Sequence, residues 1–454
     1  MPVEGFMPEN NFVGDRRDLL KLGAAAFTTA IFTGNLKGAN DRIRVSFIGT
    51  GRQGQGNMGS AMAHPDVDVV SVCDIYQPNL EKAQARSARG PNGEPGGRPA
   101  AKAIKDFREV LADKSVDAVC IATPDHWHAY MAVEACKAGK DVYVEKPISV
   151  TIEEGRKMVQ AARKYNRVVQ VGTQQRSGVH FQKATQLVKD GAIGKVTFIR
   201  TFNYGNGPVE GIGTPADSAP PSDLDWKMWL GPAPERPFNK NRFGMDPNAF
   251  SHFRWFWDYA GGMMTDWGVH VLDIAQMAFN ELSPRSITSI GGKYMIKDNR
   301  ETPDTLQVTY EYPNGMIATY ENRMFNGNAL YGGALAGRSY GTVFHGDKGT
   351  LFVDRASYVI LPEKGSSLTE TVVQSSNNHG RDHWRNFLDC IKNRQKPASD
   401  IENGHRSTST ALLGNIALRT GLRLDWNAEK ETLAQAPARP YLERKYTKPW
   451  ELKV

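Results

Sequence analysis

The chain has 454 residues, of which 40% are hydrophobic and 23% charged, with a formal net charge of +7. This length allows two domains with a well-buried core. No lysine or arginine run of the nucleic-acid-binding type occurs, so the positive surplus is interpreted as solvated surface charge. The four cysteines form neither a CxxC pair nor a zinc spacing, and we expect no disulfide and no metal site.

Residues 1–40 are predicted to be a signal or N-terminal arm. Residues 16–21 read RRDLLK, a twin-arginine pattern, and a weakly apolar stretch follows from 22 to 34. That stretch is too short and too mild for a membrane span. The pattern favours export by the twin-arginine route to the periplasm, with an uncleaved amphipathic arm as the alternative. Since no clear cleavage site follows, membrane retention through an uncleaved signal stays open.

Residues 41–150 alternate apolar runs with helical segments. Near-continuous apolar runs are typical of parallel strands that are buried on both faces. The pattern predicts an α/β domain with a doubly wound parallel sheet of the Rossmann type. The expected strands are 43–48, 67–73, 118–122 and 142–144, and the expected helices begin near 58 and 129.

From residue 151 the pattern changes to strands in which polar and apolar residues alternate, as in sheets with one solvated face. We predict an α+β substrate-binding domain over 151–421, with an open, mostly antiparallel sheet, and a C-terminal tail over 422–454. A free sheet face needs a cover, either a partner subunit or loops, and we expect a homo-oligomer that forms through this sheet. After a helix at 152–165 and a strand at 168–171, strands are expected at 197–202, 286–291, 305–312, 316–322, 341–345 and 350–353.

A long segment from 205 to 262 is rich in proline, glycine and tryptophan. Segments of this length without regular structure are usually functional. Its tryptophans either stack on the apolar face of a sugar or form a small core of their own, and we favour the second for most of them. They are Trp226, Trp229, Trp255 and Trp257.

The turn GTGRQG predicts a dinucleotide site because it follows a buried strand and precedes a helix. Gly49 permits the tight turn, Gly51 lets backbone amides approach a pyrophosphate, and Gly54 lets the helix pack on the strand. Asp74 closes the next strand, 25 positions after Gly49, and is expected to accept hydrogen bonds from the adenosine ribose. A carboxylate there repels a 2′-phosphate, so NAD is favoured over NADP. Arg52 is a candidate phosphate contact.

Two further motifs follow directly on predicted strands and so lie at the carboxyl edge of the sheet, where ligands bind in such folds. In the first, Thr123 and Pro124 follow a strand, and His128 is predicted to reach the nicotinamide ribose. In the second, Glu145 and Lys146 follow another strand. A lysine can take the proton of a hydroxyl group when its pKa is lowered toward the working pH, although an ordinary surface lysine is the alternative.

Asp266 and His270 complement this lysine. They are spaced i, i+4 in a predicted helix, which places both side chains on one face. A carboxylate and an imidazole on an otherwise apolar helix are costly unless they are used or satisfied. Helix capping by Thr265 or Asp266 is the alternative interpretation.

The order of these motifs resembles the Gfo/Idh/MocA family, the group of glucose–fructose oxidoreductase and inositol dehydrogenase. The resemblance runs from residue 43 to about residue 421, and the twin-arginine pattern is similar to an exported subgroup. The motifs that carry it are GTGRQG, Asp74, ATPDHWHA, VEKPIS, GTQQRS and GGMMTDWGVHVLD.

The resemblance implies a site. Lys146 would hydrogen-bond the reacting hydroxyl, His270 would act as the principal acid and base, and Asp266 would hold the sugar. Arg176 would line the substrate pocket. Glu145 shapes its strand end and, with Lys146 and the Thr123–Pro124 pair, belongs to the cofactor side.

The resemblance also shows one departure, because the family commonly has asparagine where this chain has Asp125. The sequence therefore predicts an NAD-dependent enzyme that transfers a hydride between a secondary hydroxyl of a sugar, cyclitol or glycoside and the nicotinamide. Two alternatives stay open. One is a glycosidase that oxidises, eliminates and re-reduces with a recycled, bound NAD, which ranks lower because Lys146 is intact. The other is a non-catalytic sugar sensor, against which the retained catalytic trio argues.

Overall fold

The computed structural model describes residues 42–90, 93–244, 251–280, 282–329 and 331–454. The predicted twin-arginine signal lies outside these residues. In the described part of the chain, no helix combines the length and apolar character needed to cross a bilayer. All four cysteines are buried free thiols.

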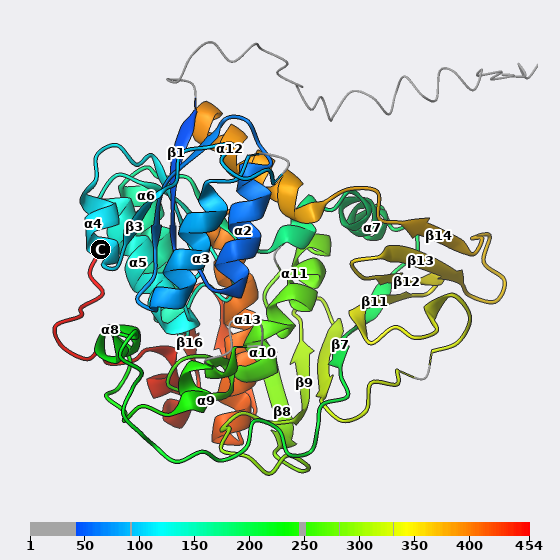
Figure 1. Ribbon diagram of the computed structural model, residues 1–454. Helices are drawn as coiled ribbons and strands as arrows, with labels where there is room; N and C mark the ends of the chain where they lie inside the picture. The colour runs from blue at the N-terminus through cyan, green and yellow to red at the C-terminus, as the bar shows by residue number, and fades with distance from the viewer. Residues whose placement is uncertain (1–41, 91–92, 245–250, 281, 330) are drawn as a thin grey trace, which may run out of the picture. The chain divides into compact units, whose positions relative to one another are not determined.

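The N-terminal domain is built on a parallel sheet with helices packed around it (Figure 1). The sheet has six strands in the order β3-β2-β1-β4-β5-β6. This confirms the doubly wound parallel sheet. The strands are β1 (Ile43–Ile48), β2 (Val67–Cys73), β3 (Lys102–Ile104), β4 (Ala118–Ile121), β5 (Asp141–Val144) and β6 (Val169–Val171). The helices between them are α2 (Arg52–Met62), α3 (Gln77–Ser87), α4 (Phe107–Ala112), α5 (Asp125–Lys137) and α6 (Ile152–Lys164).

Both faces of this sheet are covered by helices. One core joins the sheet to α2, α3 and the late helix α12 (His379–Asn393). The other core joins the opposite face to α4, α5 and α6. Because successive strand residues point to opposite faces, a strand between two such cores must be apolar throughout, which explains the continuous runs.

The C-terminal domain is built on a ten-stranded, mostly antiparallel sheet, in which only β7 and β10 pair in parallel. Helices α7 (Val179–Lys189), α11 (Gly268–Ala278) and α13 (Ile401–Thr420) cover one face and form the largest core. The strands are β7 (Val196–Tyr204), β8 (Ser286–Gly292), β9 (Thr305–Glu311), β10 (Ile317–Arg323), β11 (Tyr340–Gly346), β12 (Gly349–Val353), β13 (Ser357–Pro362), β14 (Thr371–Gln374), β15 (Leu424–Asn427) and β16 (Thr432–Leu433).

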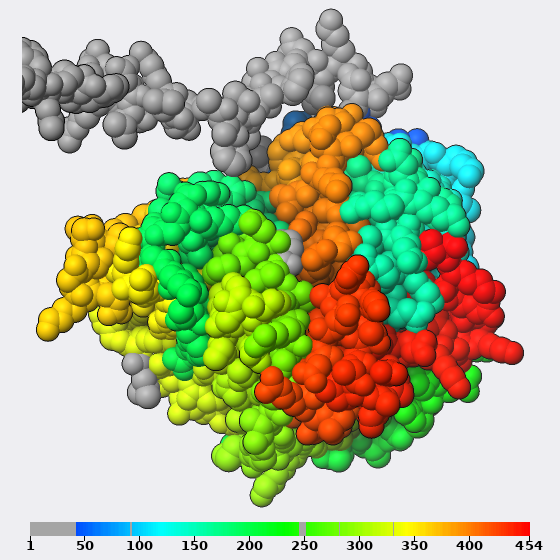
Figure 2. All heavy atoms as spheres, turned by 180° about the vertical axis from the view of Figure 1, so that it is seen from behind, coloured from blue at the N-terminus to red at the C-terminus, as the bar shows by residue number. Residues whose placement is uncertain are grey.

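Some segments cross the predicted boundaries. The first sheet continues past residue 150 to include β6, and β15 and β16 extend the second sheet past residue 421. The C-terminal segment, red in Figure 2, then returns to the N-terminal domain. There, Arg444 and Tyr446 each donate to Glu154, at 2.7 and 2.6 Å. These are contacts between distant segments, and local periodicity carries no signal for them.

Helix α2 starts six residues earlier than predicted, directly at the glycine turn (52 instead of 58). Glycine disfavours a helix, but close packing of Gly54 on the first strand overrides that preference. In the long segment, α8 (Trp226–Leu230), α9 (Lys240–Phe243) and a 3₁₀ turn (His252–Trp255) enclose a small core. Trp226, Trp229 and Trp255 lie in that core, as favoured from the sequence.

Candidate active site

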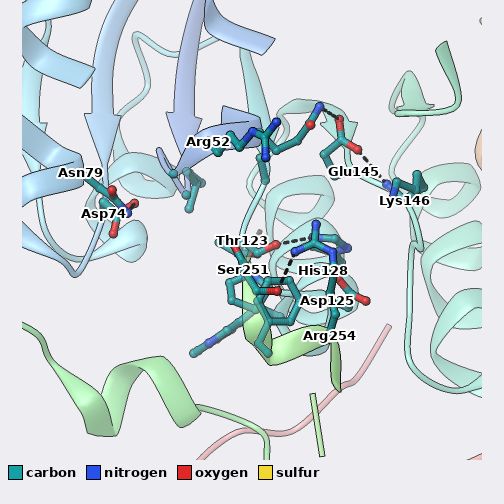
Figure 3. A pocket seen from close by; sticks show the side chains of 18 of the residues that line it. Arg52, Asp74, Asn79, Thr123, Asp125, His128, Glu145, Lys146, Ser251 and Arg254 are labelled. Carbon is teal, nitrogen blue, oxygen red and sulfur yellow. Dashed lines mark hydrogen bonds between the residues drawn. The ribbon is translucent and has the colours of Figure 1, made fainter. Parts of the chain in front are cut away.

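A cavity of about 600 Å³ lies at the carboxyl ends of the parallel strands and is also lined by the C-terminal domain. Its size suits a cofactor together with a small substrate. Figure 3 shows Asp74 with Asn79 on one side of the view and Glu145 with Lys146 on the other. The Asp74 side is called the cofactor end here, and the part around Lys146, Asp266 and His270 is called the substrate end. All of the predicted site residues line this cavity except Gly54 and Arg176.

The glycine turn is closely packed at two of its three positions. A Cβ atom at Gly54 would lie 2.0 Å from the carbonyl oxygen of Gly49. Gly49 has φ +81°, and a Cβ there would lie 2.6 Å from the backbone nitrogen of Thr123. Only glycine therefore lets the first turn of α2 lie this close to β1 and β4. At Gly51, the cavity itself occupies the space, as a cofactor pyrophosphate needs.

Asp74 is held in place by the turn that it faces. Its Oδ2 accepts hydrogen bonds from the backbone N–H and the hydroxyl of Thr50, at 2.8 and 3.2 Å. Its Oδ1 accepts from the backbone N–H of Tyr76 at 3.0 Å. Across the pocket, Thr123 Oγ1 is buried and has no partner among the described residues. A fixed carboxylate and an unsatisfied hydroxyl facing one cavity fit a polar ligand such as the ribose and amide groups of NAD.

Glu145 connects several segments of the site, whereas the sequence predicted that it shapes its strand end and belongs to the cofactor side. Its Oε1 accepts hydrogen bonds from the side chains of Asn57, Gln53 and Gln174, at 2.9, 3.0 and 3.2 Å. Burial raises the pKa of Glu145. The carboxylate thus connects α2 to the segment after β6 and fixes the strand end that carries Lys146.

His128 lines the cavity and lies close to two backbone carbonyl groups. Its ring nitrogens lie 2.7 Å from the carbonyl oxygen of Pro147 and 2.8 Å from that of Thr123. Burial lowers the pKa of His128 to about 4, and a neutral imidazole has one N–H, so it donates to one of the two carbonyls at a time. The imidazole lies between the ends of β4 and β5, which both face the cavity, and its contact with a nicotinamide ribose stays a prediction.

Lys146, Asp266 and Arg254 form the charged centre of the substrate end. Lys146 Nζ donates to Asp266 Oδ1 at 2.8 Å and to the backbone oxygen of Asp266 at 2.9 Å. Arg254 Nε donates to the same Oδ1 at 3.0 Å. Although burial opposes it, these two cations hold the pKa of Asp266 below its ordinary value. Asp266 is therefore a permanent anion that positions both cations.

Asp266 and His270 do not share one continuous helix. Helix α10 (Gly262–Asp266) ends before Trp267, and α11 begins at Gly268. The break exposes the backbone oxygen of Asp266, which is the one that Lys146 contacts. Both side chains still line the cavity.

His270 is held in its neutral form in the site. Burial holds its pKa well below the ordinary value, and the positive charges of Lys146 and Arg355 add to that effect. Its Nδ1 is buried without a partner within the described residues. A neutral imidazole has one nitrogen that accepts a hydrogen bond, so His270 is available as a base.

Asp125 stands where the family commonly has asparagine. It is buried at the start of α5 and lines the cavity near Arg254 (Figure 3). Burial raises its pKa to about 7, while Arg254 and Lys146 act in the opposite direction. Near neutral pH, this carboxyl group is therefore partly protonated and partly ionised, whereas an asparagine side chain does not titrate.

Arg176 does not reach the cavity. It is 5% exposed and donates from Nε and Nη2 to Asp273 at 2.9 and 2.8 Å. Asp273 also accepts from the hydroxyl of Ser407 at 2.7 Å. The predicted substrate contact therefore gives way to a buried ion pair between the segment after β6 and helix α11.

Sequence reasoning missed several lining residues. Arg254 lies in the tryptophan-rich segment that was marked as functional by its length, so that signal pointed to the correct region. Arg355 lies in a short turn between strands, and no sequence motif pointed to it. Within the described residues, no cluster of His, Cys, Asp or Glu is arranged to hold a metal ion. Other lining residues that were missed include Gln53, Gln174 and Gln175, and Asn57 supports the lining by donating to Glu145.

Relatives with solved structures share this fold. The aldose–aldose oxidoreductase of Caulobacter crescentus, complexed with glycerol, matches with a TM-score of 0.61 at 17% identity, over 85% of this chain and 99% of that chain. The WlbA dehydrogenase of Bordetella pertussis, in complex with NADH and UDP-GlcNAcA, matches with a TM-score of 0.62 at 18% identity, over 85% and 99%.

Two curated relatives differ in how much of them is matched. Myo-inositol 2-dehydrogenase of Thermotoga maritima is 22% identical over 386 residues, or 83% of this chain and 96% of the relative. A glycosyl hydrolase family 109 protein of a Shewanella species is 33% identical over 124 residues, which are 27% of this chain and 26% of that protein.

Family models match both domains. The description "oxidoreductase family, NAD-binding Rossmann fold" applies to residues 43–173, and "oxidoreductase family, C-terminal alpha/beta domain" applies to residues 178–452. Together they span both sheets and every residue of the charged centre. The chain belongs to the Gfo/Idh/MocA family of NAD-binding oxidoreductases.

Proposed function

We propose that this enzyme transfers a hydride between a secondary hydroxyl group of a sugar, cyclitol or glycoside and NAD. The observation that carries the proposal is the position of a neutral, buried imidazole beside an ion-paired lysine at one end of a dinucleotide cavity. His270 and Lys146 supply the base and the hydrogen-bond donor that alcohol oxidation needs.

The residues divide the work of the reaction. The oxidised cofactor, when bound, supplies the hydride acceptor. Lys146 donates a hydrogen bond to the reacting hydroxyl oxygen and stabilises the negative charge that develops there. His270 takes the hydroxyl proton, and in the reverse direction it returns the proton to the carbonyl oxygen. Asp266 holds Lys146 in position and accepts a hydrogen bond from the sugar.

Replacing the two proton-transfer residues tests the proposal. Lys146→Ala and His270→Ala should each lower kcat by about 10²-fold to 10⁴-fold, the usual contribution of acid–base groups. The Kd of NADH, measured by fluorescence titration, should stay near the wild-type value. Lys348→Ala is the matched control, because Lys348 is exposed and outside the cavity. Near-wild-type turnover in both active-site variants would show that these residues are structural.

A second candidate function is a glycosidase that recycles bound NAD by oxidation, elimination and re-reduction. The similarity to a glycosyl hydrolase family 109 protein favours it, although that match covers 26% of the relative. Such an enzyme would release the aglycone of a para-nitrophenyl glycoside without net formation of NADH. A dehydrogenase would instead form NADH in proportion to the oxidised sugar.

The location and assembly of the protein are part of the proposal. The pattern of Arg16 and Arg17 supports export to the periplasm, with membrane retention if the signal stays uncleaved. The half-exposed face of the ten-stranded sheet supports a homo-oligomer through that sheet. Changing both arginines to lysine should abolish export in cell fractionation, and unchanged export would contradict the signal.

A further inference from the structure

As far as the structure describes it, the substrate end is lined by several cations. Lys146 and Arg254 both contact the carboxylate of Asp266. Arg355, in the turn between β12 and β13, adds a third cation to the cavity lining. No carboxylate of the described residues is ion-paired with Arg355.

The turn itself separates Arg355 from its neighbouring acid. Asp354 Oδ2 accepts from Arg338 Nη1 at 2.7 Å, and its Oδ1 accepts from the backbone N–H groups of Ala356 and Ser357 at 2.8 and 3.0 Å. Asp354 is 3% exposed, whereas Arg355 is exposed to the cavity. The carboxylate is therefore fully used inside the turn, and the guanidinium stays available to a ligand.

An aromatic ring holds Arg355 next to the base. Its guanidinium carbon lies 4.9 Å from the ring centroid of Trp267, and the Trp267 ring lies 6.0 Å from that of His270. This cation–π contact places the charge at the substrate end without neutralising it. Gln175, also in the lining, is 4% exposed, and its Oε1 has no partner in the described structure.

The remaining acids near this end interact with Lys146 and Arg254 rather than with Arg355. Glu145 accepts hydrogen bonds from three side-chain amide groups and interacts with Lys146. Asp125 is partly protonated near neutral pH, because burial raises its pKa to about 7. The imidazoles of His270 and His379 face Arg355, and burial lowers both of their pKa values, so they add neither charge nor compensation.

We propose that the substrate is an acidic sugar whose carboxylate or phosphate group pairs with the guanidinium of Arg355 while its hydroxyl group reacts at His270 and Lys146. This inference rests on the hydride-transfer function proposed above and narrows its substrate class. Guanidinium groups bind carboxylates and phosphates through two parallel hydrogen bonds, which add geometric specificity to the attraction between the charges.

The experiment compares three sugars that differ in charge. Glucose, glucuronate and glucose-6-phosphate are titrated calorimetrically into the NAD⁺-saturated enzyme, and at least one acid should bind about 10-fold to 100-fold tighter than glucose. Which acid binds tighter distinguishes a carboxylate from a phosphate substrate. Arg355→Gln should remove the preference, and Arg355→Lys should retain part of it. Lys364→Gln, the same change of charge at an exposed residue outside the cavity, should have no effect.

Several results would overturn the inference. They are equal affinity for glucose and both acids, no binding of any of the three sugars, or an unchanged preference in Arg355→Gln. Formation of NADH from the same sugars is measured in parallel. Selective binding of an acid without NADH formation would contradict the hydride-transfer function alone, while NADH formation without preference would contradict the acidic-sugar inference alone.

Discussion

The cofactor end and the substrate end of the cavity are built from different kinds of group. At the cofactor end, Gly49 and Gly54 shape the backbone, and Asp74 is fixed by hydrogen bonds to the same turn. At the substrate end, charged side chains from separate segments share one carboxylate, that of Asp266. The first end therefore depends on close backbone packing, and the second depends on a balance of charge.

The largest effect should come from the buried ion pair behind the substrate end. Asp273→Asn leaves the guanidinium of Arg176 with reduced compensation in a buried place, and it should lower the free energy of unfolding by about 3 to 5 kcal/mol. Urea denaturation followed by tryptophan fluorescence measures this. Glu153→Gln, which removes a half-exposed i, i+4 pair with Lys157, should cost under about 1 kcal/mol. Equal losses in the two variants would show that charge balance does not govern this end.

The backbone packing of the cofactor end predicts the next largest effect. Gly54→Ala places a Cβ atom 2.0 Å from the carbonyl oxygen of Gly49 and must push α2 away from β1. The Kd of NADH should rise about 100-fold, which corresponds to about 3 kcal/mol. Gly56→Ala is the control in the same helix, because a Cβ there meets nothing within 4 Å. Unchanged NADH binding in Gly54→Ala would contradict the role of the turn.

A smaller effect is expected in the pH dependence of stability, through the buried carboxyl group of Asp125. The folded-state pKa of Asp125 is about 7, above the ordinary value of an aspartate, so its bound proton stabilises the fold at low pH. This stabilisation is complete below about pH 4 and is lost as the pH rises through about 7. Asp125→Asn does not titrate, and its stability relative to the wild type should rise by about 2 kcal/mol between about pH 5 and pH 8. A difference in unfolding free energy that stays constant across this pH range would rule out the raised pKa of Asp125.

Local patterns predicted the cofactor end well. The glycine turn, the strands on either side of it and Asp74 are all close in sequence, and all line or support the cavity as expected. The start of α2 was not predicted correctly, because close packing of Gly54 on the first strand outweighed helix propensity.

The sequence alone determined the parallel sheet and the glycine turn, and its motifs singled out Lys146, Asp266 and His270 as the candidate catalytic group. Periodicity and motif spacing act over short separations along the chain. Only the tertiary structure decided which charges meet. It paired Arg176 with Asp273 and brought Arg254 and Arg355 to the substrate end. Coulomb energies depend on distance in space and on burial, and neither quantity can be obtained from separation along the chain.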